Sequence, residues 1–309
     1  MIVGVLRETA VDERRVALIP DDVRGLASVD VIVERDAGRS IGFSDADYRA
    51  SGARIAERAE VFARSDIVVW VKPPAYPLDS VRPGTALIGF QEPLHRSDVI
   101  AGLRTRGIES IGYETVAHSR PDIDALSAMS RIAGEVAYAQ GRQLCSAHGA
   151  MRALILGCGQ AGLAAITAAV AHGDEPTAIG NRPDQESLAI QHGAKTFLPN
   201  PVGLLAHLAA EPPDLIVCAA VHRGNRGPLL LDGAALDILR PGTVIVDLVA
   251  KSGGNCVATI PDRDVTLPNG VIVTHRSNYP TLRPLEASVA YSAATAALLK
   301  TYSITEKQW

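Results

Sequence analysis

The sequence is poor in cysteine and in aromatic residues. Aromatic residues make up 4% of the 309 positions, and the four cysteines are Cys145, Cys158, Cys218 and Cys256. They are far apart, form no C-x-x-C pair and have no nearby histidine at zinc-ligand spacing. This pattern argues against a disulfide framework and against a zinc site. We expect reduced, mostly buried thiols and no bound metal.

Long apolar runs and clusters of one charge are also missing. No stretch approaches the roughly 20 apolar residues that a membrane helix needs. No Lys/Arg run marks a nucleic-acid footprint or a membrane-surface patch, and the formal net charge is −4. The N-terminus opens on the strand-like Ile2–Val5 rather than on a secretory signal. We expect a cytoplasmic protein with neither nucleic acid nor membrane as a partner.

The sequence does have the material for packed cores. Hydrophobic residues make up 47% and charged residues 21% of the chain, a balance typical of globular proteins. Short β-branched runs alternate with Ala-rich amphipathic stretches, which predicts βαβ units and mainly parallel sheets. The predicted strands are Ile2–Val5, Val29–Glu34, Ile67–Val71, Ala86–Phe90, Ser110–Tyr113, Ala153–Leu156, Thr177–Gly180, Leu215–Ala219, Thr243–Asp247 and Val271–Thr274. The predicted helices are Asp21–Ala27, Ser97–Thr105, Ser130–Leu144, Ala161–His172, Asp184–His192, Pro201–Ala209, Gly233–Ile238 and Leu285–Tyr302.

The chain is long enough for two domains. A polar, Gly-containing stretch at Ala147–Arg152 precedes an apolar strand and sets the predicted boundary. We expect residues 1–149 to form an N-terminal α/β substrate lobe and residues 150–275 to form a Rossmann dinucleotide-binding lobe. A C-terminal helix within residues 276–309 would cross back onto the first lobe. Two such Rossmann-like lobes would bind ligand in the cleft between them.

The most specific motif is a G-x-G-x-x-G turn directly after the predicted strand at 153–156. Gly157 can make the tight turn, Gly159 lets the backbone approach a pyrophosphate, and Gly162 permits close helix–strand packing. Gln160 and Ala161 open the helix, whose N-terminus offers N–H groups and a positive dipole to phosphates. Because the turn lies between a strand and a helix, it predicts a nicotinamide-dinucleotide site rather than a structural turn.

The end of the next strand indicates which dinucleotide binds. NAD sites carry an acid about 20 residues after the glycines, which holds the ribose hydroxyls. Here the strand ends on Gly180-Asn181-Arg182 without an acid. Asn181 can hydrogen-bond, and Arg182 suits a 2′-phosphate by charge and fork geometry, so we expect NADP(H) in preference to NAD(H). The alternative is that Arg182 is a solvated loop residue and Asp184 supplies the acid.

Further positions follow the predicted strand at 215–219. Ala219 and Ala220 lie at its carboxyl end, the edge at which open α/β sheets bind ligands, and are expected to contact the cofactor. His222 and Arg223 come next. They either border the nicotinamide or belong to an ordinary loop.

Two N-terminal segments carry charge close to predicted strand ends. Arg15 could bind a carboxylate through two parallel hydrogen bonds. Lys72 follows the strand at 67–71, so it points toward the ligand side of an open sheet and could polarise a carbonyl or imine. On composition alone, both would instead be ordinary surface ion-pair residues.

Several distinct short motifs are spread over nearly the whole chain. They are Val3–Glu8 with Arg14–Pro20, Ala37–Gly38 with Gly42–Asp45, Val71–Pro74, Gly112–Val116, Asp124–Ser130 with Ile132–Gly134, the glycine-rich turn, Pro241–Leu248 and Gly253–Cys256. Together these motifs resemble the alanine dehydrogenase/proton-pumping transhydrogenase α-subunit family. The resemblance implies a two-lobed fold with a nicotinamide site.

The resemblance also implies roles for individual residues. Arg15 stands where the alanine dehydrogenases bind the substrate carboxylate, and Lys72 where they contact the oxygen or nitrogen on the reacting carbon. Asn278 lies in an element that is near substrate and cofactor in those enzymes. Asp124 aligns with an aspartate of the nicotinamide-holding segment of transhydrogenases, although Pro121 replaces the glutamine of that segment.

Two positions depart from the alanine dehydrogenase pattern. Glu92 stands in place of a catalytic histidine, with His95 three residues later, and Lys251 stands in place of an aspartate. A carboxylate at position 92 could bind a substrate ammonium or transfer a proton. His95 could instead be the acid/base near neutral pH. Lys251 together with Lys72 would suit an anionic substrate.

The leading hypothesis is an NADP(H)-dependent oxidoreductase that reduces a C=O or C=N bond of an amino-acid-like or 2-oxo-acid-like carboxylate substrate. Arg15 would hold the carboxylate, Lys72 would polarise the acceptor, and Glu92 or His95 would relay the proton. We expect a homodimer. One alternative is a non-catalytic dinucleotide-binding or redox-sensing protein. Another is a soluble transhydrogenase-like subunit that works with a partner protein.

Overall fold

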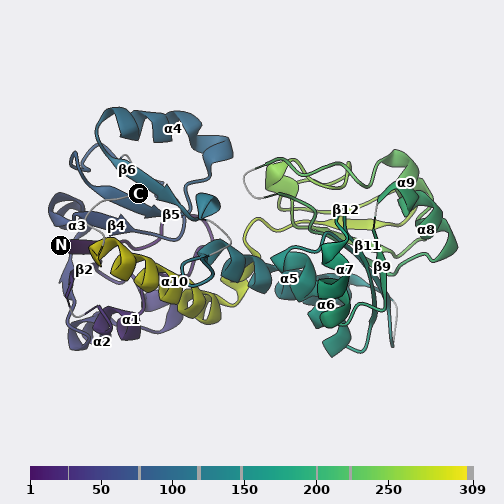
Figure 1. The fold of residues 1–309 in the computed structure, drawn as a ribbon, viewed down its shortest axis with the longest axis horizontal. Helices are drawn as coiled ribbons and strands as arrows, with labels where there is room; N and C mark the ends of the chain where they lie inside the picture. The colour runs from purple at the N-terminus through teal and green to yellow at the C-terminus, as the bar shows by residue number, and fades with distance from the viewer. Residues whose placement is uncertain are drawn as a thin grey trace. The chain divides into compact units, whose positions relative to one another are not determined.

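The computed structural model divides into two compact α/β units (Figure 1). It describes residues 1–26, 28–75, 78–116, 120–146, 149–199, 201–222 and 225–304. Unit 1 comprises Met1–Met129 and the chain from Arg283 onward, and unit 2 comprises Ser130–Leu282. Each unit is built on a mainly parallel sheet, so the predicted fold class is confirmed.

Within the described residues, unit 1 has a six-stranded parallel sheet in the order β3-β2-β1-β4-β5-β6. Buried residues run continuously along β4 and β5, as expected for a sheet covered on both faces. The strands are β1 (Ile2–Val5), β2 (Asp30–Glu34), β3 (Arg54–Ala56), β4 (Ile67–Val69), β5 (Ala86–Gly89) and β6 (Glu109–Gly112). The helices are α1 (Pro20–Arg24), α2 (Asp45–Ala50), α3 (Arg58–Arg64), α4 (Pro93–Thr105) and α10 (Pro284–Ile304).

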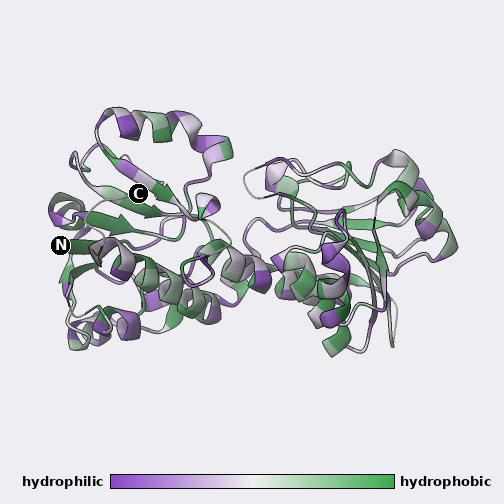
Figure 2. Cartoon of the chain, in the orientation of Figure 1, coloured by the Kyte–Doolittle hydropathy of each residue, from purple (hydrophilic) through white to green (hydrophobic). Residues whose placement is uncertain are grey.

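Unit 2 has a seven-stranded sheet in the order β12-β13-β11-β10-β7-β8-β9 among its described residues. Only the edge strand β12 is antiparallel to its neighbour, and Figure 2 shows that the inner strands are the most uniformly hydrophobic segments. The strands are β7 (Arg152–Leu156), β8 (Glu175–Ile179), β9 (Thr196–Leu198), β10 (Leu215–Cys218), β11 (Val244–Asp247), β12 (Asp264–Thr266) and β13 (Ile272–Thr274). The helices are α6 (Gln160–Ala171), α7 (Asp184–Gln191), α8 (Leu204–Ala210) and α9 (Gly233–Asp237).

Helix α5 (Ala125–Leu144) carries the chain from unit 1 into unit 2. The sequence analysis drew its boundary after this helix, at 149/150, whereas contacts group the helix from Ser130 onward with unit 2. The chain rejoins unit 1 at Arg283, a few residues later than the start of the predicted segment 276–309. An unbroken helix keeps the same spacing of apolar residues throughout. The sequence pattern therefore does not show where α5 passes from packing in unit 1 to packing in unit 2.

The predicted strands all occur, with ends within two residues of the prediction. The prediction missed the strands β3, β9 and β12 and the helices α2 and α3. The missed strands have three residues each and few buried residues, unlike the equally short but fully buried β4. The missed helices have six and seven residues.

Helix α10 brings the end of the chain against the start of unit 1. Ser288 and Ser292 accept hydrogen bonds from the backbone N–H groups of Val16 and Ile19, at 3.1 and 2.9 Å. These serines belong to a buried stripe at i, i+3, i+4 and i+7, which lies along one face of the helix. The stripe is Ser288, Tyr291, Ser292 and Thr295. The loop that carries Arg15 is therefore fixed by residues about 270 positions away in the sequence.

Helices α5 and α6 approach each other closely in unit 2. A Cβ atom added at Gly134 of α5 would lie 2.0 Å from the carbonyl oxygen of Ala161, in the first turn of α6. The first turn of α6 follows the glycine-rich turn directly, so this contact fixes the turn against α5.

We predict that Gly134→Ala lowers the free energy of unfolding by about 1–3 kcal/mol, because the added methyl group overpacks this contact. The matched control is Gly102→Ala in α4, where an added Cβ meets nothing within 4 Å. That change should raise stability by about 0.5–1 kcal/mol through helix propensity. Urea unfolding measures both variants. A Gly134→Ala protein as stable as wild type would contradict the close approach of the helices.

Candidate functional site

The turn between β7 and α6 is closed by its own packing. Gly157 has φ +104°, and a Cβ there would lie 2.7 Å from the carbonyl oxygen of Ala219 and from the Cα of Ala220. A Cβ at Gly162 would lie 1.8 Å from the carbonyl oxygen of Gly157. Gly157 and Gly162 are therefore required by the protein itself. They also bring Ala219 and Ala220 against the turn, next to the residues predicted to bind the cofactor.

Gly159 differs from the other two glycines. Its φ is −83°, which any residue can adopt, and an added Cβ would meet nothing within 4 Å. Gly159 is also the N-cap of α6 and provides no side-chain cap for the N–H groups of Gln160 and Ala161. Neither backbone strain nor packing explains a glycine at this position. Close approach of an external phosphate group to the helix N-terminus does explain it, so the turn fits a dinucleotide.

The end of β8 is shaped by Gln185. A Cβ at Gly180 would lie 2.5 Å from Gln185 Oε1, so packing within the protein accounts for this glycine. The same buried oxygen accepts hydrogen bonds from the backbone N–H groups of Asn181 and Arg182, at 3.0 and 3.2 Å. The backbone at the predicted ribose site is thus held by Gln185, which the sequence analysis did not identify.

Arg182 and Asp184, the two residues that decided between NADP and NAD in the sequence, form an ion pair with each other. Their atoms are 3.2 Å apart (Nε–Oδ1) and 3.3 Å apart (Nη2–Oδ2), and the side chains are 53% and 64% exposed. An exposed pair of this kind contributes about 0–1 kcal/mol. A phosphate group can therefore compete for the guanidinium.

A buried aspartate organises the loop after β11. Asp247 is fully buried and accepts hydrogen bonds from Val249, Asn255, Cys256 and Thr259. Asn255 in turn accepts from the N–H of Ala220 at 3.0 Å and donates to its carbonyl at 2.9 Å. Ala220 is therefore fixed on both its polar backbone groups. Asp247 and Asn255 are positioning residues that the sequence analysis did not single out.

Lys251 and Asn278 are the predicted substrate contacts of unit 2, and Lys251 is exposed in a short 3₁₀ turn. Burial raises the pKa of Asp262, but hydrogen bonds from Ser277 and the charges of His275 and Lys251 outweigh it, so the pKa of Asp262 is lowered. Asp262 accepts from both the N–H and the hydroxyl of Ser277, each at 2.6 Å, which fixes the residue before Asn278. His222 is exposed, and Arg223 lies outside the described residues.

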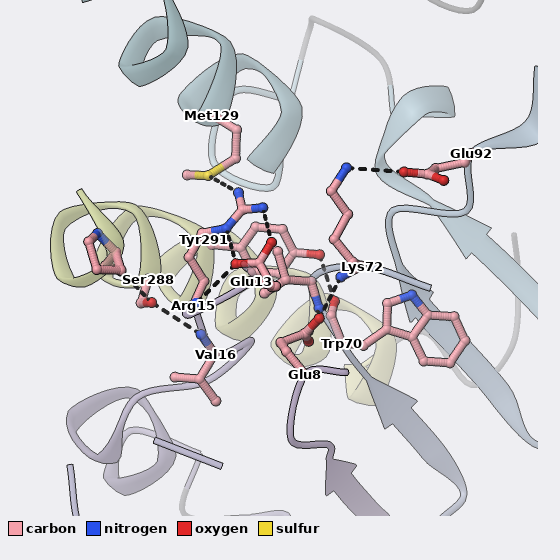
Figure 3. A network of polar contacts seen from close by, with 12 residues as sticks. Glu8, Glu13, Arg15, Val16, Trp70, Lys72, Glu92, Met129, Ser288 and Tyr291 are labelled. Carbon is pink, nitrogen blue, oxygen red and sulfur yellow. Dashed lines mark hydrogen bonds and ion pairs between the residues drawn. The ribbon is translucent and has the colours of Figure 1, made fainter. Parts of the chain in front are cut away.

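In unit 1, Lys72 and Glu92 form an ion pair of 3.1 Å at the carboxyl ends of the neighbouring strands β4 and β5 (Figure 3). Their side chains are 18% and 29% exposed, so the pair is largely shielded from water. The Lys72 ammonium also lies 5.5 Å from the centroid of the Phe90 ring, within cation–π range.

Glu92 is held in an unusual backbone conformation. Its φ is +52°, and it is the N-cap of α4, directly before Pro93. Its N–H donates to Glu114 Oε1 at 2.8 Å, and its carbonyl accepts from the N–H groups of His95 and Arg96. His95 lies exposed in the first turn of α4. Of the two candidate acid/base residues, Glu92 is therefore the one that contacts Lys72.

Arg15 is buried, not on the surface. Its guanidinium forms two hydrogen bonds to Glu13, at 2.7 and 2.6 Å, and the side chains are 1% and 0% exposed. Its Nη1 donates to Met129 Sδ at 3.2 Å. A substrate carboxylate would thus share the guanidinium with Glu13. In Figure 3 the Arg15 guanidinium and the Lys72 ammonium extend in the same direction from the network.

Glu8 lies below Lys72 in this network. Its carboxylate accepts hydrogen bonds from the N–H groups of Val71 at 2.7 Å and Lys72 at 2.9 Å, and burial raises the pKa of Glu8 to about 8. The sequence analysis quoted Glu8 and Glu114 only within family motifs and passed over Glu13 as a partner of Arg15. Glu8 and Glu114 each closely follow a predicted strand, which was the available signal, whereas Glu13 does not.

Asp124 was predicted to contact the cofactor. In the structure it is buried and precedes the first residue of α5. Its carboxylate accepts hydrogen bonds from the N–H of Ser127 at 3.0 Å and from its hydroxyl at 2.7 Å. This is the geometry of a helix N-cap.

The glycine turn and the helix N-terminus define the class of protein: an α/β protein with a turn that fits a dinucleotide. Residues 4–133 match the family "Alanine dehydrogenase/PNT, N-terminal domain", and residues 130–309 match "Alanine dehydrogenase/PNT, C-terminal domain". The chain therefore belongs to the alanine dehydrogenase/PNT family.

Relatives of both kinds are similar to the chain. The NAD(P) transhydrogenase subunit alpha of Haemophilus influenzae is 31% identical over 97% of this chain, which spans 66% of that protein's length. The alanine dehydrogenase of Bacillus subtilis is 31% identical over 96% of this chain and 84% of its own length. A transhydrogenase structure from Sinorhizobium meliloti superposes with a TM-score of 0.89 at 26% identity and covers 97% of this chain and 94% of that one. No helix in the described part of the chain has the length and hydrophobicity needed to cross a membrane.

We predict that Gly159→Ala lowers affinity for NADPH at least about tenfold, equivalent to 1.4 kcal/mol, without lowering stability. The reason is that the new methyl group would occupy space open to the ligand rather than to the protein. Titration calorimetry and thermal unfolding measure the two quantities. The matched control is Gly233→Ala, another position where a Cβ meets nothing. Unchanged NADPH binding in Gly159→Ala would show that the phosphates lie elsewhere.

Proposed function

We propose that this protein is an NADP(H)-dependent oxidoreductase that reduces a C=O or C=N bond of an amino-acid-like or 2-oxo-acid-like carboxylate. The observation that carries the proposal is the shielded Lys72–Glu92 ion pair at the carboxyl edge of the unit 1 sheet. A buried arginine, Arg15, lies in the same hydrogen-bonded network. Ligands of open α/β sheets bind at this edge.

Each member of the pair has a chemical task. The Lys72 ammonium donates a hydrogen bond to the acceptor oxygen or nitrogen, and this stabilises the negative charge that develops there. The dinucleotide, when bound to unit 2, supplies the hydride that the acceptor carbon receives. The acceptor heteroatom also gains a proton, which passes through the hydrogen-bonded Lys72–Glu92 pair. Glu92 additionally attracts a cationic iminium or ammonium group, which Lys72 alone would repel.

Arg15 binds the substrate carboxylate in this proposal. Its guanidinium is fixed by Glu13, which also offsets part of its charge. The fixed orientation favours one mode of carboxylate binding, and the shared charge limits the affinity. Lys251 and Asn278 remain proposed contacts for the substrate on unit 2, and Asp124 a proposed contact for the cofactor.

The preference for NADP(H) rests on the end of β8. The strand ends on Gly180-Asn181-Arg182 without the usual ribose-binding acid, and the Arg182 guanidinium pairs with an exposed partner, Asp184, two residues away. A 2′-phosphate carries more charge than the Asp184 carboxylate and can displace it from the guanidinium. Cytoplasmic location and homodimer formation remain predictions from the sequence.

A transhydrogenase-like role is the second candidate. It is favoured by the similarity of the whole chain to transhydrogenase chains, whose sequences and structures it matches over nearly its full length. In that case NADH would pass hydride to a second nicotinamide nucleotide, with the help of a partner protein, rather than to a keto acid. An assay with an NAD analogue and without a keto acid distinguishes the two roles.

Lys72→Ala should lower kcat for reduction of 2-oxo acids by about 100-fold or more, because the acceptor loses its hydrogen-bond donor. NADPH binding should stay within about twofold, since the glycine turn belongs to unit 2. Steady-state kinetics and calorimetry measure the two effects. Lys195→Ala, which removes an exposed lysine paired with Glu175, is the control and should keep full activity. Turnover that survives Lys72→Ala would refute this mechanism.

Wild-type protein should bind NADPH more tightly than NADH. Arg182→Ala should weaken NADPH about tenfold, or 1.4 kcal/mol, and leave NADH unchanged, because only NADPH carries the 2′-phosphate. Asp184→Asn is the matched variant: it removes the competing carboxylate and should strengthen NADPH binding. Calorimetric affinities for both nucleotides decide the point. Tighter binding of NADH by the wild type would overturn the proposed preference.

A further inference from the structure

Glutamates lie at three strand ends along the carboxyl edge of the unit 1 sheet. Glu34 is the last residue of β2, Glu8 follows β1, and Glu114 follows β6. Each carboxylate accepts backbone N–H groups from the chain just beyond the neighbouring strand. Glu34 accepts from Arg7 at 2.9 Å, beyond β1.

The other two glutamates hold the segments that carry Lys72 and Glu92. Glu8 accepts from the N–H groups of Val71 and Lys72, beyond β4, at 2.7 and 2.9 Å. Glu114 accepts from the N–H groups of Gln91 and Glu92, beyond β5, at 3.0 and 2.8 Å. Strands β4 and β5 are neighbours, so the two held segments adjoin, and the Lys72–Glu92 ion pair joins them. Figure 3 shows Glu8 beneath the Lys72 backbone and the ion pair above it.

These carboxylates offset two costs of the local backbone. N–H groups beyond the last ladder bond would lack partners, at about 1–3 kcal/mol for each buried group. The φ of +52° at Glu92 is unfavourable for a residue with a side chain and persists only where its surroundings impose it. Glu114 imposes it, because its Oε1 receives the N–H of Glu92 itself and the N–H of the preceding residue, Gln91.

Two further hydrogen bonds fix the held segments relative to each other. The Trp70 indole donates to the carbonyl of Phe90 at 3.0 Å, which links the two segments directly. The Tyr291 hydroxyl of α10 donates to the carbonyl of Trp70 at 2.7 Å. The backbone on either side of the ion pair is thereby fixed before any ligand binds.

We propose that Glu8 and Glu114 are positioning residues that hold Lys72 and Glu92 in contact. The inference rests on the proposed role of the Lys72–Glu92 pair in proton transfer. It distinguishes residues that position the backbone from residues that contact the substrate. Glu8 and Glu114 act only through the backbone, while Lys72 and Glu92 meet the substrate. A misplacement of about 1 Å at such a pair can lower a rate about 100-fold.

Glu8 and Glu114 differ in how their oxygens accept the backbone N–H groups, and substitution by glutamine tests this difference. Glu8 uses a different oxygen for each N–H group, so Glu8→Gln must turn its NH₂ group toward one of these donors. Glu114 accepts both N–H groups at Oε1, and the Gln91 N–H also contacts Oε2 at the longer distance of 3.2 Å, so Glu114→Gln can keep the shared acceptor Oε1 and loses only that longer contact. Glu8→Gln should therefore displace Lys72, whereas Glu114→Gln should be tolerated and Glu114→Ala should not.

The test follows Lys72 directly. The chain has five lysines, so reductive ¹³C-methylation gives few NMR signals, and Lys72→Ala assigns the signal of Lys72. The pH titration of this signal reports contact with Glu92. We expect Glu8→Gln and Glu114→Ala to change the signal and its titration midpoint, and Glu114→Gln to reproduce wild type. The Lys195 signal in unit 2 should not move, and Glu34→Gln, at the same sheet edge but not beside the pair, should leave Lys72 unchanged.

Activity supplies the second readout. Turnover of a 2-oxo acid with NADPH should fall about 10- to 100-fold in Glu8→Gln and Glu114→Ala, through kcat rather than KM, and recover in Glu114→Gln. A Lys72 titration identical to wild type in Glu114→Ala overturns the proposal, even if Glu8→Gln fails to fold. If the NMR pattern is as expected but wild type reduces no substrate, the proposed function fails and the positioning role stands.

Discussion

Backbone N–H groups at the carboxyl ends of parallel strands are the constraint on which both units depend. Beyond the last ladder bond these donors have no strand partner, and burying them unpaired is costly. In unit 1 the protein supplies the acceptors itself, from glutamates on neighbouring strands such as Glu8 and Glu114. In unit 2, Asp247 and Asn255 occupy donors after β10 and β11, while the N-cap of α6, Gly159, supplies no side-chain acceptor.

This difference separates the tasks of the units. A helix N-terminus uncapped by any side chain suits a phosphate, which brings negative charge and several acceptors at once. A strand edge whose donors are already satisfied leaves its side chains, Lys72 and Glu92, to meet a smaller molecule. The departure from the alanine dehydrogenase pattern that the sequence resemblance implies, at Glu92, falls on this second edge.

The candidate site could be read from the sequence wherever a residue is marked by local pattern. The glycine turn, Lys72 and Glu92 all stand directly after apolar runs that end at a sheet edge, so their placement followed from strand prediction alone. Glu13 beneath Arg15 and Gln185 behind Arg182 do not stand directly after a predicted strand, and the position of Glu114 after one did not show that it would hold the backbone of Glu92. Their roles arise from contacts made by the folded chain, and a carboxylate or amide looks the same in the sequence whether it is solvated or holds a neighbour's backbone.

The sequence by itself determined the α/β class, the strands of five residues or so and the glycine-rich turn, because each depends on the spacing of nearby residues. Only the tertiary structure decided that α5 belongs to both units and that the serines of α10 hold the loop of Arg15. It also decided that Lys72 and Glu92 meet. These contacts join residues separated by up to 273 positions, and contacts over such a separation produce no local pattern in the sequence.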